Sequence, residues 1–211
     1  MRTTNTHRSP HHRHFRHPWK LCVLTFFVPF TGCDLEILGP CTGTYCRDDG
    51  ASGEVINGPH QPAISGNLIV WTDYRNGGQG IYLYDLATGI ESLISSSAGV
   101  QDQPAISGTR IVWRDSRYGD YYISMYDVAT ATETQISKHT AYKSDPAISG
   151  SRIVWTYYRR GGEGIYMYDL ATGAVSLIVP GAGFLGQPAI SGDRIVWADY
   201  RNGDYDICIY N

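Results

Sequence analysis

The pentapeptide Pro-Ala-Ile-Ser-Gly occurs four times in this chain, and each occurrence starts 42 residues after the one before, at Pro62, Pro104, Pro146 and Pro188. A fixed repeat of this length indicates an array of similar supersecondary units, each of which buries its faces against its neighbours. The repeat therefore constrains the fold much more tightly than it constrains the activity.

Each repeat has the pattern of four short strands separated by turns. In the first repeat, the apolar residues 61–65 and the β-branched and aromatic residues 68–74 are expected to be strands. A glycine turn follows, the alternating residues 80–86 predict a third strand, and residues 91–95 predict a fourth, outer strand. Four antiparallel strands in 42 residues make one propeller blade, so the sequence predicts an all-β protein, a β-propeller of four 42-residue, four-stranded blades.

The repeated residues also resemble a known family. Pro-Ala-Ile-Ser-Gly-x-Arg-Ile-Val-Trp-x-Asp-x-Arg, continued by Ile-Tyr-x-Tyr-Asp-Leu-Ala-Thr-Gly, is similar to the TolB-like β-propeller repeats of bacterial periplasmic and archaeal cell-surface proteins. The resemblance covers residues 61–211, and members of that family usually have six or seven blades. This chain shows four repeats, which we place at 61–102, 103–144, 145–186 and 187–211, the last of them incomplete.

The last repeat stops after its third strand, which would leave an open sheet edge. Residues 54–57 resemble the outer strands at 91–94 and 175–178, so they are expected to pair with residues 207–210 and complete the fourth blade. Two alternatives are a homodimer in which two chains share one eight-bladed ring, and a chain truncated from a larger propeller.

The first 32 residues have the composition of an export signal. A stretch with five basic and no acidic residues precedes the apolar residues 21–30, which are too few to span a bilayer as a helix. Phe30-Thr31-Gly32-Cys33 resembles the lipobox of bacterial lipoproteins, which implies lipidation at Cys33; an ordinary cleaved signal is the alternative. We expect an exported protein, periplasmic or at the cell surface, that contacts the membrane only through this anchor and has a linker at residues 33–60.

Three cysteines remain if Cys33 is lipidated. Cys41 and Cys46 are close enough in sequence to form a disulfide in an oxidising compartment, although Cys208 is an alternative partner for either one. The sequence has no second close-spaced Cys or His pair for a structural zinc site and none of the common nucleophile or phosphate-loop motifs in a suitable context. No metal, no cofactor and no catalytic residue is therefore predicted.

Net charge argues against a nucleic-acid partner. The chain has 17 Lys and Arg against 20 Asp and Glu, and loss of residues 1–32 removes five basic residues and no acid, which leaves a net charge of about −8. Affinity for nucleic acid comes largely from cations that neutralise phosphates, so an acidic exported domain is a poor candidate for DNA or RNA binding.

Two sets of polar and aromatic residues recur in every repeat. Trp71, Trp113, Trp155 and Trp197 lie within apolar strands and are expected in the core between blades. Arg75, Arg117, Arg159 and Arg201 each follow an acid by two residues, except that Tyr157 precedes Arg159. Residues two apart share one face of a strand, so structural ion pairs are expected. Alternatively these arginines bind an anionic ligand at one rim, with Arg159 the most available.

Recognition is expected where the repeats differ, in the loops at Ser96 to Asp102, Lys138 to Asp145 and Pro180 to Gly186. The predicted function is a non-catalytic protein-binding or scaffold module of the cell envelope, with an envelope protein as its partner. The alternatives are a carbohydrate-binding surface module, which needs aromatic side chains exposed on a rim, an enzyme, which needs His, Arg and acids gathered at one mouth, and a truncated fragment of a larger TolB-like propeller.

Overall fold

The computed structural model describes residues 59–75, 77–117, 119–138, 141–159, 162–181, 185–201 and 203–211. All of the described residues belong to the unit 53–211, and residues 1–52 lie outside them. The predictions on the export signal, on Cys33, Cys41 and Cys46, and on the closing strand at 54–57 therefore also lie outside them.

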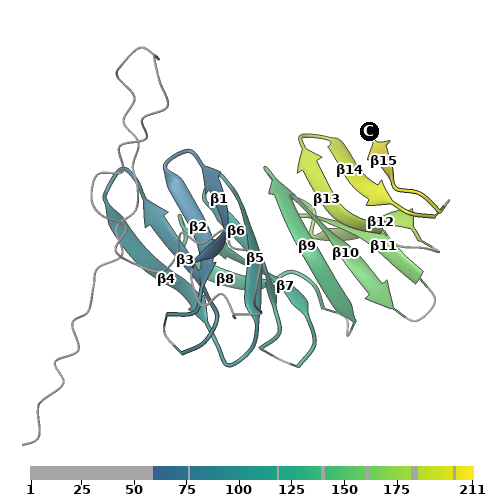
Figure 1. Ribbon diagram of the computed structural model, residues 1–211. Coiled ribbons are helices and arrows are strands. Elements are labelled where there is room, and N and C mark those ends of the chain that lie inside the picture. The colour runs from purple at the N-terminus through teal and green to yellow at the C-terminus, as the bar shows by residue number, and fades with distance from the viewer. Residues whose placement is uncertain are drawn as a thin grey trace, which may run out of the picture. The chain divides into compact units, whose positions relative to one another are not determined.

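The described residues form fifteen strands in four antiparallel sheets, one for each repeat (Figure 1). The first blade contains β1 (His60–Ser65), β2 (Leu68–Asp73), β3 (Gly80–Asp85) and β4 (Ile90–Ser96). The second contains β5 (Gln101–Ser107), β6 (Arg110–Asp115), β7 (Tyr122–Asp127) and β8 (Thr132–Gln135). The third contains β9 (Tyr142–Ser149), β10 (Arg152–Arg159), β11 (Gly162–Asp169) and β12 (Ala174–Pro180). The fourth contains β13 (Leu185–Ser191), β14 (Arg194–Asp199) and β15 (Asp206–Tyr210).

This architecture confirms the predicted all-β fold of propeller blades. Each sheet keeps the order first, second, third and, where present, fourth strand, with antiparallel pairing throughout. Tight turns with glycine at positive φ, such as Gly66 and Gly108, join first to second strands, where a Cβ would strain the backbone. No helix among the described residues is long and apolar enough to cross a membrane.

Apolar clusters between successive blades form the core. The first cluster joins Val70 and Ile81 of the first blade to Ile111 and Trp113 of the second. The second and third clusters repeat this arrangement one blade further on each time, around Trp155 and Trp197. Trp113, Trp155 and Trp197 pack in these clusters, as predicted for residues between blades, whereas Trp71 is buried, at 7% exposure, without belonging to any of the three clusters of described residues.

Hydrogen bonds with the period of the repeat connect the first strands of neighbouring blades. At one end of these strands, the Gln103 amide donates to Gln61 Oε1 (2.8 Å), and the Asp145 amide donates to Gln103 Oε1 (2.9 Å). At the other end, the amides of Gly108, Gly150 and Gly192 donate to the hydroxyls of Ser65, Ser107 and Ser149, at 2.9–3.0 Å. The first strands therefore run in the same direction in every blade, so corresponding ends of the blades lie on the same side.

The residue that precedes the repeated proline has an unusual backbone conformation. Gln61, Gln103, Asp145 and Gln187 all have φ of 53–54°, in the left-handed region, and a register shift interrupts the pairing of the first and second strands there. Non-glycine residues pay a steric cost for this conformation. At Gln61 and Gln103 the side chain accepts the bond from the next blade, which offsets part of that cost.

Candidate functional site

The antiparallel topology places two kinds of connection at one end of every blade. The turns from second to third strand and the links from one blade to the next lie together there, and we call this side the loop rim. All three loops that differ between repeats belong to it. The described strands extend into those loops, because β5 begins at Gln101, β9 at Tyr142 and β13 at Leu185.

A unit of Trp, Asp and Arg fixes the end of the second strand in three of the four blades. In the second blade, Arg117 Nε donates to Asp115 Oδ2 (2.7 Å), and its backbone amide donates to Asp115 Oδ1 (3.0 Å). Trp113 Nε1 donates to Asp115 Oδ2 (3.2 Å), so the acid also orients the buried indole. The first and fourth blades repeat these contacts around Asp73 and Asp199.

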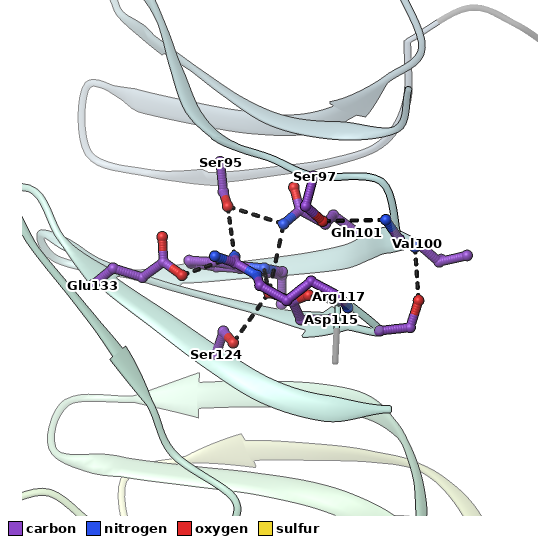
Figure 2. Close-up of polar contacts among 11 residues, drawn as sticks. Ser95, Ser97, Val100, Gln101, Asp115, Arg117, Ser124 and Glu133 are labelled. Atoms are coloured by element: carbon purple, nitrogen blue, oxygen red, sulfur yellow. Dashed lines mark hydrogen bonds and ion pairs between the residues drawn. The ribbon is translucent and has the colours of Figure 1, made fainter. Parts of the chain in front are cut away.

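The polar network around Asp115 extends into the first blade (Figure 2). Ser95 of β4 accepts from Arg117 Nη2 (2.8 Å) and from Gln101 Nε2 (3.0 Å). Glu133 of β8 forms an ion pair with Arg117 at 2.8 Å, and the Ser124 hydroxyl donates to Asp115 (3.3 Å). The expected ion pairs are thus present, and they link two blades in addition to fixing one turn.

The ion pairs of the repeated arginines do not test the predicted anion site. Arg75, Arg117 and Arg201 each form an ion pair with the acid two residues earlier, at 2.5–2.7 Å. The hydrogen bond from Arg201 is the main cause that lowers the pKa of Asp199 to about 2. The side chain of Arg159 lies outside the described residues, so anion binding by these four arginines remains a prediction.

The third blade lacks the unit of Trp, Asp and Arg that the other three blades have. Tyr157 replaces the acid, and the buried Trp155 Nε1 and Thr156 Oγ1 have no hydrogen-bond partner among the residues that the structure describes. The Tyr157 ring instead packs against Tyr166, with 5.0 Å between centroids. The local chemistry of the third blade is therefore aromatic where the other three are ionic.

The third blade also has a lysine, Lys143, at the position that Gln101 occupies in the second blade. Its side chain is only 2% exposed, and Nζ donates to the carbonyl of Ala141 (2.9 Å) and lies 5.0 and 5.4 Å from the ring centroids of Tyr122 and Tyr157. Burial lowers the pKa of Lys143 to about 8, although the charge of Asp120 opposes the shift. The sequence had placed Lys143 in a polar loop, whereas the structure places it inside β9.

This pKa predicts a rise of stability in alkaline solution. Between pH 8 and the ordinary value of 10.5, the unfolded chain holds a proton that folded Lys143 has released, so the free energy of unfolding increases with pH. Lys143→Met is expected to flatten that increase. Urea unfolding at pH 7.5, 8.5 and 9.5 measures it, and an equal slope in both proteins would contradict the prediction.

The loop rim carries a further cluster that the repeat does not contain, which we call the tyrosine–arginine cluster: Asp102, Arg114, Tyr121, Tyr142 and Tyr158. Asp102 holds the Arg114 guanidinium with two bonds, at 2.5 and 2.7 Å. That group lies 4.7 Å from the ring centroid of Tyr121 and donates to the Tyr142 hydroxyl. Bidentate pairing and stacking together fix the guanidinium in one orientation.

The aromatic rings of the cluster come from two blades. The ring centroids of Tyr121 and Tyr142 are 4.8 Å apart, and those of Tyr142 and Tyr158 are 5.3 Å apart with the rings edge to face. Burial raises the pKa of Tyr158, while Tyr142 remains 42% exposed. The cluster thus presents one half-exposed aromatic ring on a rigid base.

Other blades also place aromatic rings on the loop rim. Tyr200 and Tyr205 lie in the turn between β14 and β15, with centroids 4.8 Å apart and exposures of 43% and 67%. His60 stacks on Tyr74 at 5.5 Å in the first blade. His139 lies outside the described residues, and among those residues no group of three or more His, Cys, Asp or Glu is arranged to hold a metal ion.

Sequence reasoning missed the tyrosine–arginine cluster, although a signal was present. Arg114 occupies a position that is Thr72, Thr156 or Ala198 in the other repeats, and Asp102 corresponds to His60, Ser144 and Gly186. Two opposite charges that appear together in one repeat and in no other indicate a local pair. The contribution of Tyr142 from the next blade required the structure.

Comparison with solved structures places the fold among propellers. The chain is similar to TolB from Acinetobacter baumannii, with TM-score 0.63 and 23% identity over 72% of this chain and 41% of that one. It is also similar to a protein assigned as TolB from Agrobacterium tumefaciens, with TM-score 0.55 and 21% identity over 68% of this chain and 56% of that one.

A propeller from a protease is similar as well. The β-propeller domain of the Trilobed protease from Pyrococcus furiosus, which has an open velcro topology, gives TM-score 0.58 and 15% identity over 73% of this chain and 54% of that one. This chain thus spans about two fifths to just over half the length of these three proteins. No protein-family model and no curated protein sequence matches it.

Proposed function

We propose that this TolB-like propeller is a non-catalytic module, exported or lipid-anchored, that binds a protein partner of the cell envelope through its loop rim. The observation that carries the proposal is the tyrosine–arginine cluster, which breaks the repeat on the side where the variable loops lie. A residue set needed only for blade packing would recur in every blade, whereas this one occurs once.

The chemistry of the cluster favours a protein as the ligand. Tyrosine and arginine are enriched among the residues that dominate protein interfaces, and rigid side chains lose little entropy on binding. The charge of Arg114 is already neutralised by Asp102. The tyrosine–arginine cluster therefore offers a ligand an aromatic ring and a phenol hydroxyl instead of an unpaired charge. A partner with an apolar side chain and a hydrogen-bonding group fits this surface.

Similarity to solved TolB structures supports the proposed location in the cell envelope. TolB is among the similar structures, and the sequence begins with a stretch that has the pattern of an export signal. The non-catalytic part of the proposal rests on the residues of the rim. His60 stacks on Tyr74, and the acids of the Trp, Asp and Arg units already pair with arginine, so these groups are engaged in structural contacts.

Replacement of Tyr142 by alanine should weaken partner binding about tenfold or more with little effect on folding, because the ring is half exposed and a central interface aromatic is worth about 2 kcal/mol or more. The measurement is photo-cross-linking to an envelope extract through a probe on the loop rim. Val175→Ala is the matched control, since Val175 is 54% exposed on the outer strand β12. If both variants cross-linked to the same partner equally well, the tyrosine–arginine cluster would not be part of the binding interface.

A carbohydrate-binding surface module is the second candidate. The observation in its favour is the exposure of Tyr205 (67%) and Tyr200 (43%) on the same rim, because an exposed ring is a stacking surface for sugars. The test is binding of the chain to cell-wall polysaccharide. Binding that is lost in Tyr205→Ala, together with the absence of any cross-linked protein, would favour this function over protein binding.

A further inference from the structure

The buried ammonium of Lys143 connects the two segments of the loop rim that carry the tyrosine–arginine cluster. Its Nζ donates to the backbone carbonyl of Ala141 (2.9 Å), the residue before Tyr142, and at a longer distance (3.4 Å) to the carbonyl of Tyr121. Ala141 lies in the link that leads into β9 of the third blade, whereas Tyr121 lies in the turn between β6 and β7 of the second blade. One charged side chain therefore bridges the backbone segments that hold both rings.

The surroundings of Lys143 keep this bridge away from solvent. The side chain is 2% exposed, and the ring centroids of Tyr122 and Tyr157 lie 5.0 and 5.4 Å from Nζ. Asp120, in the same turn as Tyr121, is the carboxylate whose charge acts on the ammonium. Burial of a charge is costly unless hydrogen bonds compensate for it, so the two rim carbonyls help to hold the ammonium where it lies.

The other described titratable side chains on the strands that pack against β9 have contacts of their own. β13 has none, Tyr126 of β7 packs in the cluster between the first two blades, and Tyr158 of β10 belongs to the tyrosine–arginine cluster. On β9 itself, Asp145 accepts from Ser144 and Gln103. The charges on β5, β6, β7 and β10 are in ion pairs: Asp102 with Arg114, Asp115 with Arg117, Asp127 with Arg110, and Arg152 with Asp193.

The corresponding residues of two other blades make different contacts. The second blade has Gln101 at this position and the fourth has Leu185. Gln101 donates to the side chains of Ser95 and Asp115, and Leu185 packs in the apolar cluster around Trp197. The bridging lysine thus occurs at the blade interface that also carries the tyrosine–arginine cluster.

We propose that Lys143 is the positioning residue of the tyrosine–arginine cluster, because its ammonium fixes the backbones of Tyr121 and Tyr142 relative to each other across two blades. The proposal deepens the protein-binding function above and rests on it. The contact between the two rings, with centroids 4.8 Å apart, and the bond from Arg114 to the Tyr142 hydroxyl both depend on this spacing. Loss of the bridge would therefore alter the surface that the partner meets while every residue of the cluster remains.

The strength of the bridge should depend on pH, because burial lowers the pKa of Lys143 to about 8. Below this pH the ammonium donates charge-assisted hydrogen bonds to the carbonyls, and above it the neutral amine donates weaker ones. Release of the proton thus loosens the rim, although it favours the folded chain as a whole over the unfolded one.

Carbon-detected NMR of the full chain tests the bridge without a partner. Residues 141–142 are the one Ala-Tyr pair in the sequence, so alanine labelled with ¹³C at its carbonyl and tyrosine labelled with ¹⁵N give a single carbonyl–nitrogen signal from Ala141. In the wild-type chain this signal should move with a midpoint near pH 8, and in Lys143→Met it should not. A wild-type signal that stays constant from about pH 6.5 to 9.5, or that moves equally in the variant, would overturn the inference.

Photo-cross-linking to an envelope extract, through a probe on the loop rim, tests the effect on binding. At pH 7 Lys143→Met should reduce capture about tenfold, and its remaining capture should not vary with pH, whereas wild-type capture should fall between pH 7 and 9. Arg194→Met is the matched control, since it removes an exposed positive charge at the start of β14, at the end of the blade opposite the loop rim. It should keep the wild-type profile.

The experiment separates failure of the inference from failure of the proposed function. If the Ala141 signal titrates as expected but the wild-type chain captures no protein, the protein-binding function is wrong and the bridge has only a structural role. If Lys143→Met captures the same partner as well as wild type does, the cluster does not depend on Lys143 and the inference is wrong.

Discussion

Replacement of Asp115 by alanine is expected to lower the free energy of unfolding by about 3–5 kcal/mol, because it removes one partner of a buried ion pair. Asp115 is 1% exposed and accepts bonds from Trp113, Ser124 and both the backbone and side chain of Arg117. Without the carboxylate, these donors lose their partner, and Arg117 keeps only Glu133 on the outer strand β8 as a counter-charge beside the interface between two blades. Urea unfolding followed by tryptophan fluorescence measures the loss.

Asp193→Ala is the matched control for this variant. Asp193 also forms an ion pair with an arginine, Arg152, but its side chain is 84% exposed. Exposed pairs of this kind contribute about 0–1 kcal/mol, so the control should remain close to wild type. If both variants lost a similar free energy of unfolding, the buried hydrogen bonds of Asp115 would contribute no more to stability than an exposed ion pair.

Replacement of Ile123 by alanine should cost about 2–5 kcal/mol. Its side chain is 0% exposed and packs with Val112, Ile148 and Trp155 in the cluster between the second and third blades. The loss has two causes, the apolar surface that is no longer buried and a cavity that two rigid sheets cannot fill. Equilibrium unfolding in urea measures it through the shift of the midpoint.

Ile90→Ala provides the comparison, because Ile90 is 60% exposed on an outer strand. A change within about 0.5 kcal/mol is expected there. If Ile123→Ala were equally mild, the blades would not depend on each other for stability and the packing between sheets would need another explanation.

Strands and turns followed from the sequence because their causes are local. Alternating β-branched and aromatic residues, with glycine at the turns, predicted residues 80–86 as a strand, and β3 spans Gly80–Asp85. The predicted Asp and Arg pairs around Asp73, Asp115 and Asp199 are present. Their cause is the turn and not the strand period, because β2, β6 and β14 end at the acid and the arginine lies in the turn that follows, with its backbone amide bonded to the carboxylate. The packing of the repeated tryptophans followed because every blade needs the same core.

Other features depend on contacts between blades, which a single repeat does not encode. The sequence predicts a regular strand at residues 61–65, whereas Gln61 adopts positive φ and accepts a bond from the next blade, as Gln103 does in the second repeat. Tyr142 meets Arg114 only because β9 packs beside the second blade. Burial of Lys143 depends likewise on Tyr122 of the preceding blade.

The bonds between first strands also bear on how such a chain changes length in evolution. Each one joins residues 42 or 43 positions apart, between a side chain in one blade and a backbone amide in the next. Deleting 42 consecutive residues that span one inner repeat would therefore bring an equivalent acceptor to an equivalent donor, so that, after loss of residues 103–144, the Asp145 amide would meet Gln61. Gene duplication or unequal recombination can thus add or remove whole blades without the invention of a new junction.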